Sequence, residues 1–183
     1  DHIGEGGYDE TEKKIQDLLE ERNNVLKLNE QVDMSLSNPS VEETNAGKIK
    51  TPEIYFGVLF SRKQFGNPEG WQAEQEFSYK YPDKFEDNKF YLDGEWKTNP
   101  DNMELTGSSG RIYLAYTAKE VNIVAGSNKP VKITSYVDGF IHKEATVSNF
   151  DLYNIVDMDG YGRHELEITV SQPGLMAYTF TFG

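Results

Sequence analysis

The sequence predicts a mainly β protein, a jelly-roll-like antiparallel β-sandwich preceded by one amphipathic α-helix. Three observations lead to this fold class. Apolar and polar residues alternate with a period of two through most of the chain from Thr51 onward. Aromatic residues make up 13% of the chain, and their side chains fit a pleated, half-buried surface. Glycine is frequent, with 16 residues, and suits an architecture with many turns.

The first predicted element is a helix near the start of the chain. Asp9 is placed to cap it, and Glu12, three residues later, completes a capping-box pattern. Apolar residues then recur at helical spacing, and such a stripe has to be covered by something. We therefore expect the helix to pack against the sandwich or to self-associate. The residues of this apolar stripe are Ile15, Leu18, Leu19, Val25 and Leu26.

Residues 29–50 are predicted to be a linker, because they are polar and small and show no period. The β domain is expected to span 51–183. Within it, residues 64–89 form a long, charged and aromatic-rich excursion, which we expect to be a structured loop containing a short strand. Loops of this length in compact domains are often functional.

Strand patterns separated by turn signals fill the rest of the β domain. In one of them, Leu166, Ile168 and Val170 alternate with polar residues and are expected to face the core. Trp96 is also assigned to the core. In the last strand, the expected core residues are Met176, Tyr178, Phe180 and Phe182. The predicted strand segments are 52–60, 90–96, 110–118, 121–126, 131–139, 146–157, 164–171 and 175–182.

Composition excludes several classes of function. The chain has no cysteine, which rules out a thiol enzyme, a disulfide framework and a thiolate metal site within it. A formal net charge of −13 makes nucleic acid and anionic membranes poor partners. No apolar run reaches membrane-spanning length and no signal peptide opens the chain. Because the first residue is Asp1, we expect the chain to be a piece of a longer protein.

Several blocks of sequence resemble one family. TPEIYFG (51–57), GRIYLAYTAKEVNIV (110–124), LYNIV (152–156) and AYTFTFG (177–183) resemble the C-terminal domain of DipZ-type proteins. GEGGYDETEKKIQDLL (4–19) resembles the end of the thioredoxin-like domain that precedes it in that family. The resemblance implies extracytoplasmic thiol:disulfide interchange proteins, tethered to the membrane through a fused electron-transfer domain, whose C-terminal domain is similar to a carbohydrate-binding module.

The resemblance also implies a division of the chain. Residues 1–28 would be the terminal loop and helix of a thioredoxin-like domain, 29–50 a linker and 51–183 the carbohydrate-binding-module-like sandwich. The family's Cys-x-x-Cys pair has no counterpart here. We therefore expect no catalytic residue in this chain, although the parent would be a thiol:disulfide oxidoreductase.

A glycan site on a sandwich needs exposed aromatic rings and polar side chains that bind hydroxyl groups. Tyr113 and Tyr136 are out of phase with their core neighbours, and Trp71 lies in the long excursion together with Tyr79 and Tyr81. The competing interpretation is that each of these rings covers a sheet face or packs under the long loop. The predicted ligand-binding residues are Trp71, Tyr113, Tyr136, Arg111, Asn122 and Asp138.

The segment DMDGYGRH, residues 157–164, carries alternating oxygen ligands and a glycine. It is interpreted as a turn between two strands. A structural Ca²⁺ held by Asp157 and Asp159 is the alternative that it leaves open, because the EF-hand pattern would require more carboxylates. No other cofactor is expected.

Three functions follow from these patterns. The leading hypothesis is an accessory domain that binds cell-envelope glycan or a protein partner. The alternative is a structural domain that docks on and stabilises its own thioredoxin-like domain. A carbohydrate hydrolase is the third class, and it would need two carboxylates facing each other across a cleft.

Overall fold

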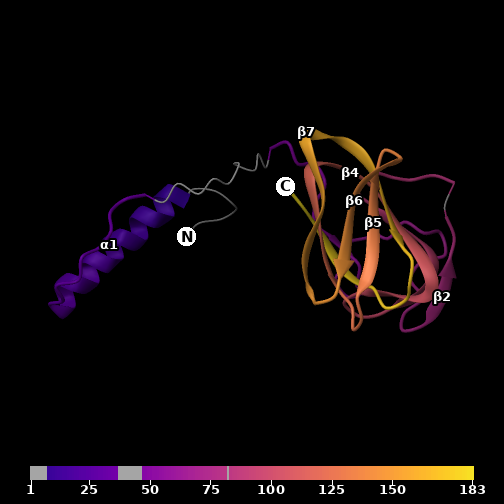
Figure 1. Ribbon diagram of the computed structural model, residues 1–183, viewed down its shortest axis with the longest axis horizontal. Helices are drawn as coiled ribbons and strands as arrows, with labels where there is room; N and C mark the ends of the chain where they lie inside the picture. The colour runs from indigo at the N-terminus through magenta and orange to yellow at the C-terminus, as the bar shows by residue number, and fades with distance from the viewer. Residues whose placement is uncertain (1–7, 37–46, 82) are drawn as a thin grey trace. The chain divides into compact units, whose positions relative to one another are not determined.

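The computed structural model describes residues 8–36, 47–81 and 83–183, and the chain divides into two compact units at residues 44 and 45. The first unit contains the one described helix, and the second contains all the described strands (Figure 1). The predicted mainly β fold with a preceding helix is thereby confirmed. No helix among the described residues is long and apolar enough to cross a membrane.

Helix α1 spans Tyr8–Leu26. It ends where Lys27 adopts a left-handed φ of 56° and the Leu28 amide donates to the Asn23 carbonyl at 2.9 Å. The predicted cap at Asp9 is wrong, because Asp9 already lies in the first turn of the helix. A carboxylate there still interacts favourably with the positive end of the helix dipole.

The residues directly after α1, up to Ser35, fold back along the helix. Residues 37–46 of the predicted linker lie outside the described residues, and the linker stays a prediction. The Asn23 side chain donates to the Glu30 carbonyl at 2.8 Å, and the Gln16 amide donates to the Ser35 carbonyl at 2.9 Å. Gln16 is consequently buried, whereas the apolar stripe remains exposed. Self-association through the stripe stays a prediction. The stripe side chains are 40–73% exposed: Ile15, Leu18, Leu19, Val25 and Leu26.

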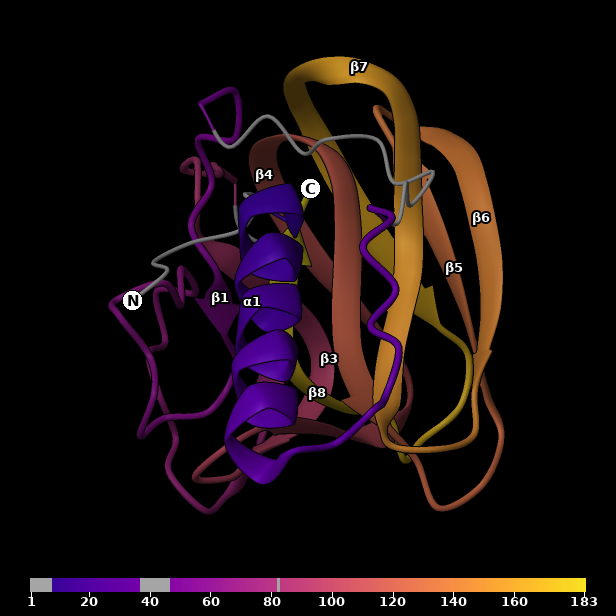
Figure 2. The same ribbon diagram turned by 90° about the vertical axis from the view of Figure 1, so that its left-hand side faces the viewer.

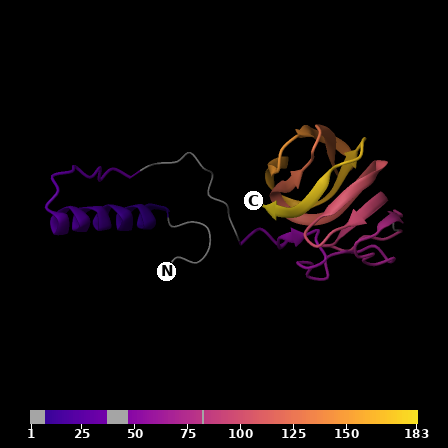
Figure 3. The same ribbon diagram turned by 90° about the horizontal axis from the view of Figure 1, so that it is seen from below.

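The second unit is one continuous antiparallel sheet that curls over itself into a sandwich (Figure 3). Its strands run in the order β1-β8-β4-β7-β5-β6, and β3 adds to β4 with β2 outside it. The strands are β1 (Ile54–Tyr55), β2 (Glu76–Tyr79), β3 (Phe90–Thr98), β4 (Met103–Gly126), β5 (Val131–Val137), β6 (Phe140–Val147), β7 (Asp151–Val170) and β8 (Met176–Phe182).

Strands β4 and β7 are long enough to belong to both layers of the sandwich. They pair with each other from Gly110 to Ala125, and β7 arches over one end of the sandwich (Figure 2). At that end the register jumps, because Ala118 pairs with Gly162 while Glu120 already pairs with Asp157. Strands commonly turn a corner between layers through such irregularities. The two layers therefore share their central strands.

This corner corrects two predictions. Residues 157–164 were predicted to be a turn between strands, but they lie inside β7, which continues through them. Residues 110–118 and 121–126 were predicted as separate strands, but both belong to β4. The physical reason is the same in each case, since polar and glycine residues absorb the register jump at the corner without reversing the chain.

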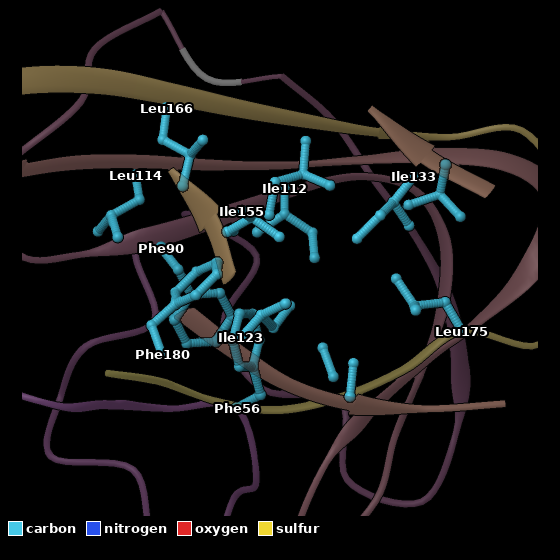
Figure 4. Close-up of a cluster of buried hydrophobic side chains, with 14 of the residues drawn as sticks. Phe56, Phe90, Ile112, Leu114, Ile123, Ile133, Ile155, Leu166, Leu175 and Phe180 are labelled. Carbon is cyan, nitrogen blue, oxygen red and sulfur yellow. The ribbon is translucent and has the colours of Figure 1, made fainter. Parts of the chain in front are cut away.

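The core lies between the layers and is dominated by aromatic and branched side chains (Figure 4). The ring centroid of Phe56 lies 4.4 Å from that of Phe90 and 5.0 Å from that of Phe180. Trp96 is completely buried, as predicted. The predicted facing of Leu166, Ile168 and Val170 is also confirmed, because all three are buried.

The predicted facing of the last strand is only partly correct. Phe180 is fully buried, but Ala177 is buried where Met176 and Tyr178 were expected. A register irregularity explains the difference, because Val124 pairs with Thr179 whereas the next residue of β4 pairs with Ala177. One residue slips out of the ladder there and reverses the facing of the residues before it.

Two strands differ from the sequence prediction for reasons of position. Most of β6 was missed, because this edge strand is largely exposed and buries only Val147. Residues 52–60 were predicted as one strand, but β1 covers only two residues. The chain turns at Gly57, where a Cβ atom would lie 2.3 Å from the Cα atom of Asp101. A close approach of two backbones requires glycine there.

Candidate functional site: a cleft on the outer face of the sheet

A row of side chains crosses the outer face of β3, β4, β7 and β5. Tyr91 pairs with Tyr113, Tyr113 with Glu167, and Glu167 with Tyr136. Cross-strand partners share one face of a sheet. The neighbours of Tyr113 and Glu167 along their strands, including Leu114, are buried in the core. The row therefore lies on the face opposite to the core.

The loop between β2 and β3 covers part of this row. The ring of Tyr81 meets that of Tyr113 edge-on, with centroids 4.1 Å apart. Phe85 lies 5.3 Å from Tyr113 and 5.0 Å from Tyr91. The backbone amide of Glu86 donates to the Tyr91 hydroxyl at 2.8 Å and fixes this part of the loop on β3. The rings consequently form one connected cluster.

Between this loop and β7 lies a cleft of about 170 Å³. This is more than one water molecule needs, so the cleft admits a small polar group, whereas a long ligand would have to extend along the surface. The lining residues are Tyr81, Phe85, Tyr113, Leu114, Ala115, Gly139, Glu165, Leu166 and Glu167.

A hairpin turn places Gly139 at the rim. Asp138 and Gly139 both have left-handed φ values, of 52° and 83°, and connect β5 to β6. The carboxylate of Asp138 accepts the backbone amide of Glu165 at 2.9 Å and contacts Nδ1 of His164 at 2.7 Å. The hairpin is thus fixed to β7 beside the cleft.

Two arginines flank the carboxylates of the cleft. Arg111 lies 3.7 Å from Glu167 and 3.9 Å from Asp93. Arg163 lies 3.4 Å from Glu165 and 2.9 Å from Asp87. Each arginine therefore faces two carboxylates, and each group of three keeps one net negative charge. The described residues that line the cleft include two acidic and no basic side chains.

The hydroxyl of Tyr113 stays protonated. Burial raises its pKa far above the ordinary value, and hydrogen bonds with Tyr81 and Glu167 act in the same direction, against the opposing effect of Arg111. The Arg111 Nη1 atom lies 3.4 Å from the hydroxyl oxygen. Burial also raises the pKa of Tyr81. Both phenols therefore present neutral hydroxyl groups, which donate and accept hydrogen bonds.

The structure brings together four of the six predicted ligand-binding residues. Tyr113 lines the cleft, and Arg111 contacts the Tyr113 hydroxyl. Tyr136 lies beside Glu167 on the same sheet face. Asp138 fixes the hairpin turn at the rim of the cleft. Phe85, Glu165 and Glu167 were not predicted. For Glu165 and Glu167, the only sequence signal was their alternation with core residues in β7. For Phe85, it was the position in the long loop.

The structure does not bring Trp71 and Asn122 to the cleft. The ring of Trp71 packs 4.6 Å from that of Phe65, in contact with the core. Asn122 lies on the part of β4 beyond the corner, where its side-chain oxygen accepts from Asn154 at 3.0 Å. Tertiary packing sets both positions. The alternation of residues along a strand does not show which neighbours a side chain will meet.

Two other predicted chemistries concern carboxylates. Asp157 and Asp159 lie at the corner of β7, and no group of three or more His, Cys, Asp or Glu side chains suited to a metal occurs among the described residues. A hydrolase would need carboxylates on opposite walls of a cleft. Glu165 and Glu167 project from the same strand, two residues apart, so they lie on one wall.

This chain is similar to a known protein family and to known proteins. A family model described as "Thioredoxin like C-terminal domain" matches residues 51–183. Protein DipZ of Mycobacterium bovis is 30% identical over 186 residues, which cover 99% of this chain and 25% of that protein. Protein DipZ of Mycobacterium tuberculosis matches equally well. The chain thus spans about a quarter of the length of these curated relatives.

Two solved structures are similar to about half of this chain. The family two carbohydrate esterase from Clostridium thermocellum, in complex with cellohexaose, has a TM-score of 0.43 and 19% identity, covering 46% of this chain and 27% of its own. The family two carbohydrate esterase from Cellvibrio japonicus has a TM-score of 0.43 and 12% identity, covering 50% of this chain and 29% of its own.

Proposed function

The chain belongs to the family of thioredoxin-like C-terminal domains, and from this premise we propose that it is a glycan-binding accessory domain of a thiol:disulfide interchange protein. In this proposal the parent protein is tethered to the membrane and carries out the redox chemistry outside the cytoplasm. The present chain contains no cysteine and contributes binding alone. Its role is to hold the redox domain near cell-envelope glycan, where the substrates of that domain are found.

The observation that carries the proposal is the clustering of rings and hydrogen-bonding groups around one cleft on a sheet face. Tyr81, Phe85 and Tyr113 provide apolar surface for the C–H face of a sugar ring. Glu165 and Glu167 accept hydrogen bonds from sugar hydroxyls, and the neutral phenols both donate and accept them. A binding site of this kind combines apolar walls with a few placed polar groups.

Tyr81 is the best residue for a test, because its ring is 44% exposed and its loss leaves the core intact. We expect Tyr81→Ala to weaken binding of a soluble envelope glycan about tenfold, since an aromatic contact contributes about 0.5–1.5 kcal/mol beyond buried area. Isothermal titration calorimetry with peptidoglycan-derived and capsular oligosaccharides would measure the change. Tyr81→Phe should retain most of the affinity.

Phe150→Ala is the matched control, because Phe150 is also exposed but lies outside the residues that line the cleft. Equal losses in Tyr81→Ala and Phe150→Ala would mean that binding does not use the cleft. Absence of binding to every oligosaccharide tested, by folded wild-type chain, would contradict the glycan function as a whole.

A second candidate function is docking on the preceding domain of the parent. It is favoured by a set of exposed apolar side chains away from the cleft, and by the three-quarters of the relatives' length that lies outside this chain. Leu152 pairs with Val124, Val124 with Thr179, and Thr179 with Tyr55, so Leu152 and Tyr55 share one sheet face. The ring of Phe60 lies 6.4 Å from that of Tyr55. The exposed residues are Leu59, Phe60, Phe150 and Leu152.

Reduction rates of the parent protein would separate the two functions. Docking predicts that replacing Phe150 and Leu152 by serine slows turnover of a small, glycan-free protein substrate or destabilises the parent. Glycan binding predicts that this double variant behaves as wild type, whereas Tyr81→Ala reduces only retention on envelope material.

A further inference from the structure

The charges and rings of the cleft point to a narrower class of ligand than glycan in general. We propose that the cleft binds the protonated amine of an amino sugar, that is, a sugar with a free amino group and no acetyl group on it. This inference rests on the glycan-binding function proposed above. It follows from three features of the cleft, which are its rings, its carboxylates and its lack of basic lining residues.

The rings form the type of wall that favours a cation. Tyr81, Phe85 and Tyr113 lie with centroids 4.1–5.3 Å apart and all line the same small space. The face of an aromatic ring attracts an ammonium group within about 6 Å, with about 0.5–1 kcal/mol at exposed sites and more where water is excluded. Tyr113 is only 7% exposed, so a bound amine would meet mainly the rings of Tyr81 and Phe85.

The carboxylates beside the rings retain capacity for a cation. Arg163 reaches Glu165 at 3.4 Å and Arg111 reaches Glu167 at 3.7 Å, both longer than the 2.7–2.9 Å of a strong charge-assisted hydrogen bond. Each carboxylate can accept about four hydrogen bonds. The side chain of Glu165 is 65% exposed and that of Glu167 is 30% exposed, so an incoming ammonium group can reach both.

The net charge of the site acts against anionic sugars. Each arginine is shared between two carboxylates of its own, which leaves negative charge beside the cleft. The chain as a whole carries a formal net charge of −13. A uronic acid or a phosphorylated sugar would meet this charge without a basic lining residue to offset it. A protonated amine is attracted by it, and part of the attraction is screened by salt.

A sugar fits the remaining features better than a lysine side chain does. The exposed ring of Tyr81 offers a flat surface beside the charged groups, and the phenol hydroxyls of Tyr81 and Tyr113 provide partners for ring hydroxyls. A lysine side chain would bring an ammonium group on a thin flexible stem and would leave those hydroxyls unused.

The test compares three oligosaccharides of equal length by calorimetry at low salt and pH 6: a glucosamine tetramer, an N-acetylglucosamine tetramer and a glucose tetramer. We expect the glucosamine tetramer to bind about two- to fivefold more tightly than the other two, as one exposed cation–π contact implies. The preference should shrink at 0.5 M NaCl and at pH 9, where a sugar amine resembling an α-amino group is deprotonated.

Glu165→Gln and Glu167→Gln keep the shape of the side chains and remove their charge. We expect each variant to lower the ratio of the glucosamine affinity to the glucose affinity, because the charge that attracts the amine is removed while an oxygen acceptor for sugar hydroxyls remains. The matched control is Glu76→Gln, because Glu76 is an exposed carboxylate on β2 outside the cleft. Thermal unfolding of each variant would establish that it folds like the wild type.

The outcomes separate this inference from the function on which it rests. Equal binding of all three tetramers, or a preference unchanged in both glutamine variants, would overturn the amine proposal and leave glycan binding in place. Absence of binding to all three tetramers would overturn the amine proposal, and absence of binding to the envelope oligosaccharides as well would overturn the function itself. Binding of Nα-acetyl-lysine amide as tight as that of glucosamine would show that the site reads an amine without a sugar, which overturns the amino-sugar assignment.

Discussion

At the scale of single residues, the buried hydroxyl of Tyr116 is the clearest local conflict. The side chain is 1% exposed, its ring lies against His164 and Phe182, and its hydroxyl oxygen has no hydrogen-bond partner among the residues that the structure describes. Burial raises its pKa far above the ordinary value, so the group is neutral at any working pH. A buried polar group without a partner loses its hydration and gains nothing in return.

We therefore expect Tyr116→Phe to stabilise the chain, by about 1 kcal/mol, since the substitution removes only the unpaired hydroxyl. Urea unfolding followed by tryptophan fluorescence would measure the change. Tyr79→Phe is the matched comparison, because Tyr79 is equally buried but its hydroxyl lies 3.4 Å from both Thr98 and the Gly70 carbonyl. It should be neutral or destabilising, and the same gain in both variants would contradict the explanation.

Glycine positions give a second comparison at this scale. A Cβ atom on Gly110 would lie 2.4 Å from Leu105 and 2.9 Å from Trp96, whereas one on Gly160 would meet nothing within 4 Å. We expect Gly110→Ala to lower the free energy of unfolding by about 1–3 kcal/mol through overpacking, and Gly160→Ala to change it by less than about 0.5 kcal/mol. Equal effects of the two substitutions on the free energy of unfolding would mean that the side chains around Trp96 can move to accommodate the added methyl group.

At the scale of elements, the turn of the β5–β6 hairpin is fixed to β7 through the Asp138 carboxylate, in addition to the pairing of β5 with β7. Burial alone would raise the pKa of Asp138, but hydrogen bonds from His164 and from the Glu165 amide outweigh it, and the pKa is lowered. A lowered carboxyl pKa means that the ionised form stabilises the fold. This contribution is present above the ordinary aspartate pKa of about 3.9 and is lost as the pH falls through the lowered value.

In Asp138→Asn, the free energy of unfolding should accordingly fall less steeply as the pH is lowered. Asparagine tolerates the left-handed φ of this turn, so the hairpin should keep its shape. Because the Asp138 side chain is 50% exposed, we expect a loss below about 1 kcal/mol at pH 7, and this loss should shrink as the pH falls below about 3.9. Urea midpoints of both proteins from pH 7 to pH 2.5 would test this, and parallel curves would contradict it.

At the scale of the whole molecule, the charge of −13 is a source of self-repulsion. Salt screens such repulsion over distances beyond about 10 Å at 0.1 M. We expect the melting temperature to rise by about 2–4 °C between 0.01 and 0.3 M NaCl, which corresponds to about 1 kcal/mol for a chain of this size. Calorimetric melts would measure it.

Sulfate at matched ionic strength distinguishes screening from general salt effects, because excluded salts strengthen burial in every protein. Screening predicts a similar rise in both salts at low concentration. A rise in sulfate alone would mean that the charge of the molecule is not what limits its stability.

The sequence by itself determined the class of fold and part of the core. Period-2 alternation in residues 166–170 depends only on which face of a strand is buried, so it could be read directly. The buried position of Trp96 and the absence of thiol chemistry followed from residue type. The family could be recognised in the same way, because matched blocks lie along nearly the whole chain.

Only the tertiary structure decided where strands continue and which residues meet. Residues 158–161 are bulged out at a corner because the residues that flank them, Asp157 and Gly162, pair with Glu120 and Ala118 of β4, and this pairing is not a local property. The edge strand β6 has no buried face to pattern it. Tyr81 and Tyr113 are 32 positions apart in number but meet at 4.1 Å, since loop packing brings them together. Local periodicity therefore fixed the faces of the strands, whereas long-range pairing formed the cleft.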